Sequence, residues 1–260
     1  MPPLLQTFDL KKSFGGLHAV AGVSITIDQG TLHTIIGPNG AGKTTFFNLL
    51  CGNIHPSSGR VVFKGTDITG MPVHRAAAHG IGRSFQITNL FPNLTAFEHV
   101  RLAAQVHSPK RFSFFSRAAT MPKETRRAYE VLELVGLQGH EQVAAAALAH
   151  GDKRRLELAM LLAPDPELLM LDEPTAGMAS EQVPQLIAII TRIRADSSKT
   201  ILLVEHRMDV VMSVSDRITV MHQGAVLAEG APREIAANPA VQRAYLGGLY
   251  GDVMHSRDTA

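Results

Sequence analysis

The chain has 260 residues, of which 45% are apolar, and a formal net charge of +2 at pH 7. This size allows one large core or two unequal subdomains, and so mild a charge gives no support to a nucleic-acid partner. No segment approaches the ~20 uninterrupted apolar residues that cross a bilayer, and the first residues are not typical of a signal peptide. The single cysteine, Cys51, excludes an internal disulfide and suits a reducing compartment. We therefore expect a soluble, cytoplasmic chain that reaches a membrane only through a partner.

Short β-branched runs alternate with helical patterns along the chain, which is typical of an α/β fold with a largely parallel sheet. The first two runs, Val23–Ile27 and Leu32–Ile36, predict strands, and residues 59–65 predict another. Nearly continuous apolar runs later in the chain predict buried strands at Leu168–Asp172, Thr200–Glu205 and Arg217–Met221. The segment AVLAEG from Ala225 predicts an antiparallel edge strand after a turn at Gln223-Gly224.

The segment GPNGAGKTT, residues 37–45, stands between a predicted strand and the helical run FFNLLCG. It matches G-x-x-x-x-G-K-[ST], in which glycines let successive backbone N–H groups point at phosphate oxygens. The following helix adds about half a unit of positive charge at its N-terminus. Lys43 can reach the terminal phosphates, and the Thr44 hydroxyl can bind Mg²⁺. The predicted contacts are Gly37, Pro38, Asn39, Gly40, Ala41, Gly42, Lys43, Thr44 and Thr45; the alternative is a glycine-rich turn with an incidental lysine.

An acidic pair ends the predicted strand in LLMLDEP. Its apolar residues present Asp172 at the carboxyl end of the strand, where a carboxylate can hold Mg²⁺ through water. Glu173 follows directly and can polarise an attacking water molecule. The alternative is a strand that ends in a solvated acidic turn, but the phosphate loop upstream favours the functional interpretation.

Strand signals disappear between about Leu90 and Pro164. Thr95 and Glu98 form a capping box that predicts the start of a helix. Apolar residues at helical spacing predict a second helix that ends near Gly136 and a third after Gly151. A helical subdomain is therefore inserted into the α/β core. Residues 108–121 have no clear period; we interpret them as a surface loop, with an amphipathic contact to a partner as the alternative.

Four further segments follow the order and spacing of one family. They are KSFGGLHAV with Phe14, RSFQITNLF with Gln86, LAHGDKRRLELA at residues 148–159, and LLVEH with His206. Nearly the whole chain resembles the nucleotide-binding subunits of ABC transporters. The resemblance implies that Phe14 stacks on adenine, that Gln86 touches the metal and faces the permease, and that His206 bridges to the γ-phosphate. It also implies that the signature motif, with Ala149, Gly151 and Asp152, contacts the nucleotide of a partner subunit. The implied catalytic residues are Lys43, Gln86, Glu173 and His206, and the implied metal ligands are Thr44, Gln86 and Asp172.

The signature motif departs from the usual LSGGQ of that family. Ala149 replaces the serine and His150 replaces the first glycine. Later in the chain, in the segment AGMAS, Ala179 stands at a position where the family usually has a polar residue. Ala149 has no hydroxyl to donate to a γ-phosphate, although the Gly151 backbone still can. These changes keep open the alternative of an interaction subunit that binds nucleotide but scarcely hydrolyses it.

The family resemblance also implies how the chain is organised. It implies a single ABC nucleotide-binding domain over residues 1–260, with a P-loop NTPase (RecA-like) core and an N-terminal antiparallel β-subdomain. The catalytic core is expected at about 1–88 and 165–235, and the inserted α-helical subdomain at about 89–164. A helical C-terminal extension is expected at about 236–260.

Several stretches, including RRLELA, VEHRMDVVMSVSDRI and NPAVQRAYLG, resemble the LivG type of branched-chain amino acid importer ATPases. This resemblance implies ATP and Mg²⁺ as cofactors, and a peripheral place on the cytoplasmic face of the inner membrane. The implied partners are transmembrane permease subunits, a periplasmic binding protein, and either a LivF-like ATPase or a second copy of this chain. Similar segments occur in ATPases of urea or short-amide importers and of lipopolysaccharide export, which are the alternatives. A soluble ABC ATPase acting on ribosomes or DNA is disfavoured by the single domain, the lack of heptads and the small charge.

Overall fold

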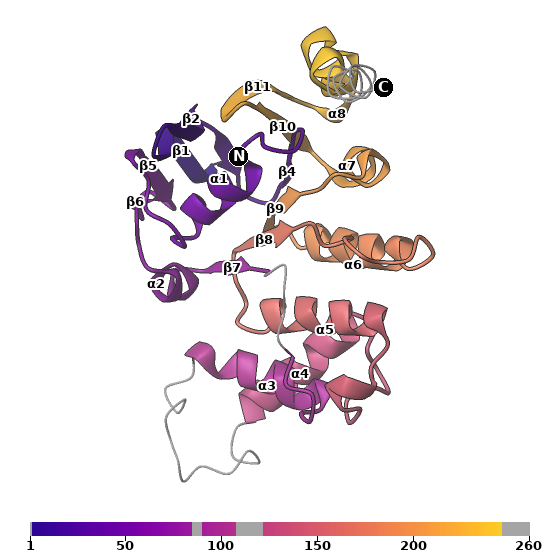
Figure 1. The fold of residues 1–260 in the computed structure, drawn as a ribbon. Helices are drawn as coiled ribbons and strands as arrows, with labels where there is room; N and C mark the ends of the chain where they lie inside the picture. Colours follow the sequence, from indigo (N-terminus) through magenta and orange to yellow (C-terminus); the bar gives the residue numbers. More distant parts are fainter. Residues whose placement is uncertain (1, 85–89, 108–121, 246–260) are drawn as a thin grey trace. The chain divides into compact units, whose positions relative to one another are not determined.

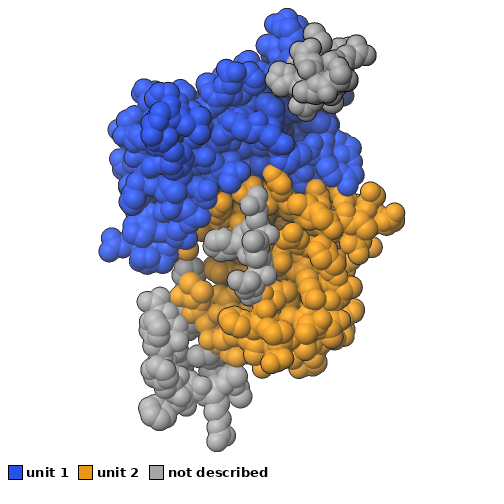
Figure 2. All heavy atoms as spheres, in the orientation of Figure 1, with its two compact units in different colours: residues 1–76, 200–260 blue, residues 77–199 orange. Residues whose placement is uncertain are grey.

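The computed structural model describes residues 2–84, 90–107 and 122–245. The chain forms two compact units, coloured separately in Figure 2: unit 1 contains residues 1–76 and 200–260, and unit 2 contains residues 77–199. None of the described helices combines the length and the apolar character needed to span a bilayer. The division into core, helical subdomain and C-terminal extension stays a prediction.

Unit 1 begins with an antiparallel sheet (Figure 1). The long strand β1 (Pro3–Phe14) pairs with β2 (Leu17–Val23), β3 (Thr26–Asp28) and β5 (Ser58–Phe63), and β6 (Thr66–Asp67) pairs with β5. The prediction of a single strand over Val23–Ile27 is wrong, because β2 ends at Val23 and β3 begins only at Thr26. The side chain of the buried Thr7 hydrogen-bonds to the backbone where the strand is interrupted. Its hydroxyl accepts from Ile25 N at 3.0 Å and donates to Val23 O at 3.0 Å.

A second sheet of unit 1 is built around β4 (Leu32–Ile36), which runs parallel to β9 (Thr200–Val204) and to β10 (Arg217–His222). The edge strand β11 (Ala225–Gly230) pairs antiparallel with β10, as predicted. Every residue of β4 and β9 is buried, and β9 is apolar after Thr200, whereas β4 also buries the polar residues His33 and Thr34. The helices of this unit that follow its strands are α1 (Lys43–Leu50), α7 (Met208–Val214) and α8 (Pro232–Ala237), and α2 (Val73–Ala78) lies at the boundary.

His33 is one of two buried polar residues inside β4, the other being Thr34. The His33 side chain is fully buried, and its Nε2 lies 2.7 Å from the Thr219 hydroxyl. Among the described residues, Nδ1 has no hydrogen-bond partner. Burial lowers the pKa of His33 from about 6.5 to about 4. The negative charges of Glu229 and Asp28 partly oppose this fall in pKa, and the positive charge of Arg217 adds to it. The imidazole is therefore neutral in the folded chain at pH 7.

Acid should weaken the fold through His33. Because its folded pKa lies below that of the unfolded chain, this stability is fully present above pH 6.5 and is lost as the pH falls towards 4. The loss reaches about 3 kcal/mol in the free energy of unfolding. Urea unfolding of the wild type and of His33→Gln between pH 4 and 7 measures this loss, since the variant has no titrating group at position 33. Parallel pH profiles for the two proteins would contradict the assignment.

Unit 2 combines a strand pair with helices. Strand β7 (Ile81–Arg83) runs parallel to β8 (Leu168–Asp172). The helices are α3 (Ala96–Ala104), α4 (Pro122–Leu134), α5 (His150–Leu162) and α6 (Val183–Ala195), with 3-10 turns η1 (Gln105–His107) and η3 (Ala145–Ala147). Described residues between 90 and 164 form no strand, only an isolated bridge between Thr95 and Ala144. The helices predicted for this stretch are confirmed, and residues 108–121 lie outside the described residues.

The predicted helix ends of unit 2 are also confirmed. The Thr95 hydroxyl accepts from Glu98 N at 3.1 Å, and the Glu98 carboxylate accepts from Thr95 N at 2.9 Å, which completes the capping box of α3. Helix α4 stops at Leu134, before Gly136 turns the chain with φ 74°.

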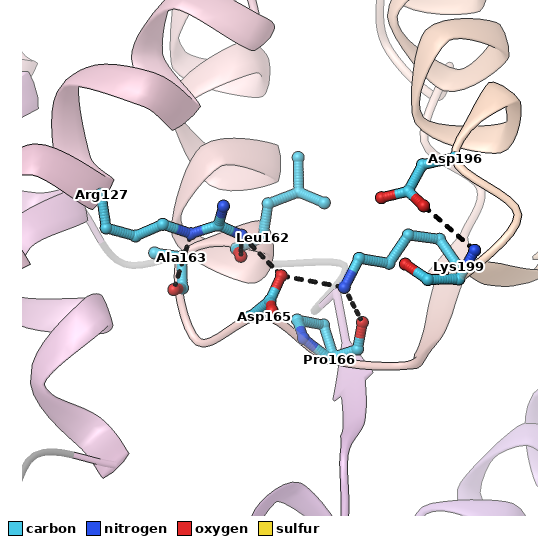
Figure 3. Close-up of polar contacts among 8 residues, drawn as sticks. Arg127, Leu162, Ala163, Asp165, Pro166, Asp196 and Lys199 are labelled. Atoms are coloured by element: carbon cyan, nitrogen blue, oxygen red, sulfur yellow. Dashed lines mark hydrogen bonds and ion pairs between the residues drawn. The ribbon is translucent and has the colours of Figure 1, made fainter.

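A polar cluster joins the end of α5 to α4 and to the turn after α6 (Figure 3). Asp165 has φ 62°, and its carboxylate accepts from Arg127 at 2.8 Å and from Lys199 at 2.9 Å. Arg127 also donates to the Leu162 carbonyl at 2.9 Å, at the negative end of α5. The Lys199 ammonium donates in addition to the Pro166 carbonyl at 3.0 Å. One carboxylate therefore holds three segments of unit 2 together.

Asp165→Asn should remove both ion pairs while keeping a residue that tolerates positive φ. The two cations retain their carbonyl partners, so we expect a loss of about 1 kcal/mol in the free energy of unfolding. High salt should shrink the difference, because it screens the lost charges. Urea unfolding measures it, with Arg126→Gln as a control that removes only the exposed Arg126–Glu130 pair. Equal effects of the two substitutions would show that the cluster has no special role.

Candidate nucleotide-binding site

The phosphate loop lies in unit 1, between β4 and α1. Gly42 is the N-cap of α1 with φ 94°, and a Cβ there would lie 2.2 Å from the Ala19 carbonyl oxygen. Only glycine fits that position. Gly40 has φ 78°, and a Cβ there would meet no atom within 4 Å. The loop is therefore packed tightly on one side at Gly42 and open at Gly40, the side on which an anion can approach the helix N-terminus.

Lys43 is 6% exposed, and its ammonium folds back onto the loop. It donates to the Gly37 carbonyl at 2.7 Å and to the Pro38 carbonyl at 3.1 Å. Thr44 is exposed and Thr45 is half-buried in the first turn of α1. The structure thus brings the predicted lysine, hydroxyls and backbone amides together around one loop, with the lysine held by carbonyls that a phosphate can replace.

Phe14 stands at the end of β1, in the hairpin that Gly15-Gly16 closes with β2. Its ring is 50% exposed, with the Lys12 ammonium 5.1 Å from its centroid. An exposed aromatic face of this kind can stack on a planar base. Gly224 ties β2 to the phosphate loop, because its N–H donates to Ala41 at 3.1 Å and its carbonyl accepts from Ala21 at 2.8 Å.

His206 follows β9 and is exposed. The residue before it, Glu205, is 2% exposed and accepts from the backbone N–H groups of His206 at 2.9 Å and of Arg207 at 3.2 Å. A buried carboxylate therefore fixes the turn that presents the imidazole.

The acidic pair lies in unit 2. Asp172 ends β8 with a side chain that is 1% exposed, and one of its oxygens lies 3.5 Å from the Arg83 guanidinium. The Ser84 hydroxyl accepts from the Asp172 N–H at 3.1 Å. Glu173 is half-buried and has φ 48°, an unusual conformation for a residue other than glycine. Such strain is typical of functional turns.

The signature segment opens α5, as predicted. Ala149 is its N-cap and supplies no side-chain hydrogen bond, and Asp152 lies 3.4 Å from Arg155. Gly151 is buried, and a Cβ there would lie 3.0 Å from the Gln182 side chain. Ala179 is exposed, and its carbonyl accepts from Gln182 N at 2.9 Å. Gln182 therefore stands between the two segments that depart from the usual pattern. Gln86 lies outside the described residues.

Comparison with known proteins decides the family. Residues 20–176 match the family model described as ABC transporter, and residues 225–249 match that of the branched-chain amino acid ATP-binding cassette transporter. The chain belongs to the ABC transporter family. It is 41% identical to the high-affinity branched-chain amino acid transport ATP-binding protein BraF of Pseudomonas aeruginosa, over 94% of this chain and 98% of that protein. It is 42% identical to LivG of Escherichia coli K12, over the same shares of the two chains.

Solved structures give the same family. The ADP conformation of MJ1267, an ATP-binding cassette of an ABC transporter, matches with a TM-score of 0.83 and 29% identity, over 95% of this chain and 100% of that one. A nucleotide-free ATP-binding cassette from an ABC transporter matches with a TM-score of 0.82 over 94% of this chain. The predicted P-loop NTPase fold and the assignment as an ATP-binding ABC ATPase are thereby confirmed.

Sequence reasoning missed three residues that support this ABC site. They are Arg83 beside Asp172, Glu205 behind His206, and Gly224 against the phosphate loop. Arg83 and Gly224 act across distant parts of the chain, so no local pattern marks them. Glu205 had a signal, since an acidic residue at the end of a buried apolar strand needs a partner. The roles of the predicted site residues themselves stay predictions.

Proposed function

We propose that this chain is the ATP-hydrolysing subunit of an importer for branched-chain amino acids. The carrying observation is that the phosphate loop and the acidic pair occur in one chain whose residues 225–249 match the branched-chain amino acid family model. The chain would act peripherally on the cytoplasmic face of the inner membrane, bound to permease subunits that a periplasmic binding protein serves. Its ATPase partner would be a LivF-like subunit or a second copy of itself.

In this proposal each residue has one task on the nucleotide. Phe14 stacks on adenine, the amides and ammonium from Gly37 to Thr45 hold the phosphates, and His206 contacts the γ-phosphate. Glu173 polarises the attacking water, which places a general base next to the strand end that Asp172 occupies. Gln86 would contact both the metal and the permease, and so couple changes at the nucleotide site to the permease.

The proposed metal is Mg²⁺, which prefers oxygen ligands. The residues present fit it, because the exposed Thr44 hydroxyl and the Asp172 carboxylate both offer oxygen. When bound, Mg²⁺ would neutralise charge on the transferred phosphoryl group. The Arg83 guanidinium lies 3.5 Å from the same Asp172 carboxylate.

The signature segment of this chain would contact the partner's nucleotide with one hydrogen-bond donor fewer than the usual signature motif offers. Ala149 offers no hydroxyl, so the start of α5, which is exposed at Ala149 and His150 and buried at Gly151, would provide its backbone amides, among them that of Gly151. We propose that these amides suffice for nucleotide contact and that the chain is a motor subunit, not a passive binder.

Glu173→Gln separates these two possibilities. Removing the carboxylate base should lower the ATPase rate of the assembled complex about 100-fold or more, with ATP binding retained. Glu181→Gln, an exposed carboxylate in the same segment, is the control and should hydrolyse like the wild type. Turnover that survives in Glu173→Gln contradicts the role of this residue, and a wild-type complex without turnover favours the passive binder.

The substrate is tested by transport. Deleting the gene for this chain should abolish uptake of radiolabelled leucine by the cells and leave urea uptake unchanged. Wild-type chain supplied on a plasmid should restore leucine uptake, and Glu173→Gln should not. Loss of urea uptake alone would point to the urea-importer alternative, and a defect in surface lipopolysaccharide would point to the exporter.

A further inference from the structure

The end of β1 carries the aromatic side chain proposed to stack on the base, and contacts from two other segments hold it. The Ser13 N–H donates to the Ser57 hydroxyl at 3.1 Å, and the Ser57 N–H donates to the Lys11 carbonyl at 2.8 Å. In addition, the Ser13 hydroxyl lies 2.9 Å from Nδ1 of His18 in β2. The residues immediately before Phe14 are therefore fixed both to β2 and to the segment around Ser57.

The second of these segments follows the helix of the phosphate loop. Helix α1 begins at Lys43 and ends at Leu50, and residues 51–57 lead from its end to β5. Within this stretch the His55 carbonyl accepts from the Lys12 ammonium at 2.8 Å. All of these residues belong to unit 1. The segment that follows the phosphate-binding helix is thus tied to the strand end that would hold the base.

Lys12 connects this segment to the Phe14 ring. Its side chain is half-buried, and its ammonium lies 5.1 Å from the centroid of the ring. A cation within about 6 Å of an aromatic face is attracted by the ring. The ammonium is therefore held between the His55 carbonyl and the ring, which restricts both side chains. Phe14 nevertheless stays 50% exposed, which leaves surface on which a base can stack.

The neighbouring lysine shows what a lysine on this strand does without such contacts. The Lys11 side chain is 46% exposed, and its ammonium pairs with Asp9 of the same strand at 2.8 Å. An exposed pair of this kind contributes little to stability. Lys12 differs because its ammonium reaches His55, 43 positions further along the chain, and the proposed base-stacking ring.

We propose that Lys12 is a positioning residue, which holds the Phe14 ring in place for the base of ATP before ATP binds. The inference rests on the proposed stacking of adenine on Phe14. Without the ammonium, the ring can change rotamer, and binding of the base must immobilise it at a cost in affinity. The phosphates would bind at Gly37 to Thr45, away from this ring, so a ligand without a base should not sense the change.

Lys12→Met tests this in the full-length chain, because it keeps a flexible stem and removes the ammonium. We expect the Kd for a non-hydrolysable ATP analogue, measured by isothermal titration, to rise about 2- to 10-fold, the cost of immobilising one side chain on binding. The Kd for inorganic tripolyphosphate, which has no base, should not change. Lys12→Arg, which keeps a cation at the ring, should bind the analogue like the wild type.

Two further variants isolate the contact with the ring. Lys11→Met is the matched control: it removes the same charge one residue away and should leave both dissociation constants unchanged. Phe14→Leu should itself bind the analogue more weakly. Adding Lys12→Met to Phe14→Leu should then have no further effect, because the lysine acts only through the ring.

Several outcomes overturn the proposal, each for a different reason. Unchanged binding of the analogue by Lys12→Met shows that the ammonium has no role, and tighter binding shows that it covers the face that the base needs. An equal rise in the Kd for the analogue and for tripolyphosphate shows that Lys12 acts on the phosphates. A Phe14→Leu chain that binds like the wild type overturns the proposed stacking. A wild-type chain that binds no analogue overturns the proposed function as well.

Discussion

The buried ammonium of Lys43 is the charge on which the candidate site depends. It cannot remain inside the protein without oxygen partners, because an unpaired buried charge costs several kcal/mol. The Gly37 and Pro38 carbonyls satisfy it, which draws the loop into a ring around the start of α1. Gly42 must then adopt φ 94° against the Ala19 carbonyl, where no side chain fits. Phosphate oxygens would replace the Gly37 and Pro38 carbonyls as partners of the Lys43 ammonium.

Strands were predictable where burial alone determines them. β4 and β8 have the predicted bounds, and β9 differs only at Glu205. A strand buried on both faces is typically a nearly continuous apolar run, as β8 and β9 are. Half-exposed strands carry no such signal. The twelve residues of β1 mix buried and exposed positions with two charged lysines, and it was expected only through family resemblance. The break between β2 and β3 depends on Thr7, which lies far from it in sequence, so no local pattern shows it.

The site shows the same limit. Motifs predicted the residues that would touch the nucleotide, since phosphate and metal chemistry restricts residue type and spacing. They did not predict the residues that hold those side chains in place. Arg83 is 89 positions from Asp172, and its guanidinium has no motif of its own. Gly224 reaches Ala41 and Ala21 through backbone groups, and any residue has such groups. Supporting contacts follow from the folded topology, which a single sequence does not display.

The departures at Ala149 and Ala179 have different structural consequences. At Ala149 the helix α5 loses a side-chain N-cap, which costs about 1 kcal/mol in the chain itself apart from any effect on a partner's nucleotide. At Ala179 only the carbonyl is used, by Gln182, so the missing polar group costs the isolated chain nothing. Gln182 also packs against Gly151, where a Cβ would lie only 3.0 Å away. A movement of the Ala179 segment would therefore reach the signature helix through one amide side chain. Gln182 therefore links the Ala179 segment to the start of α5 within unit 2.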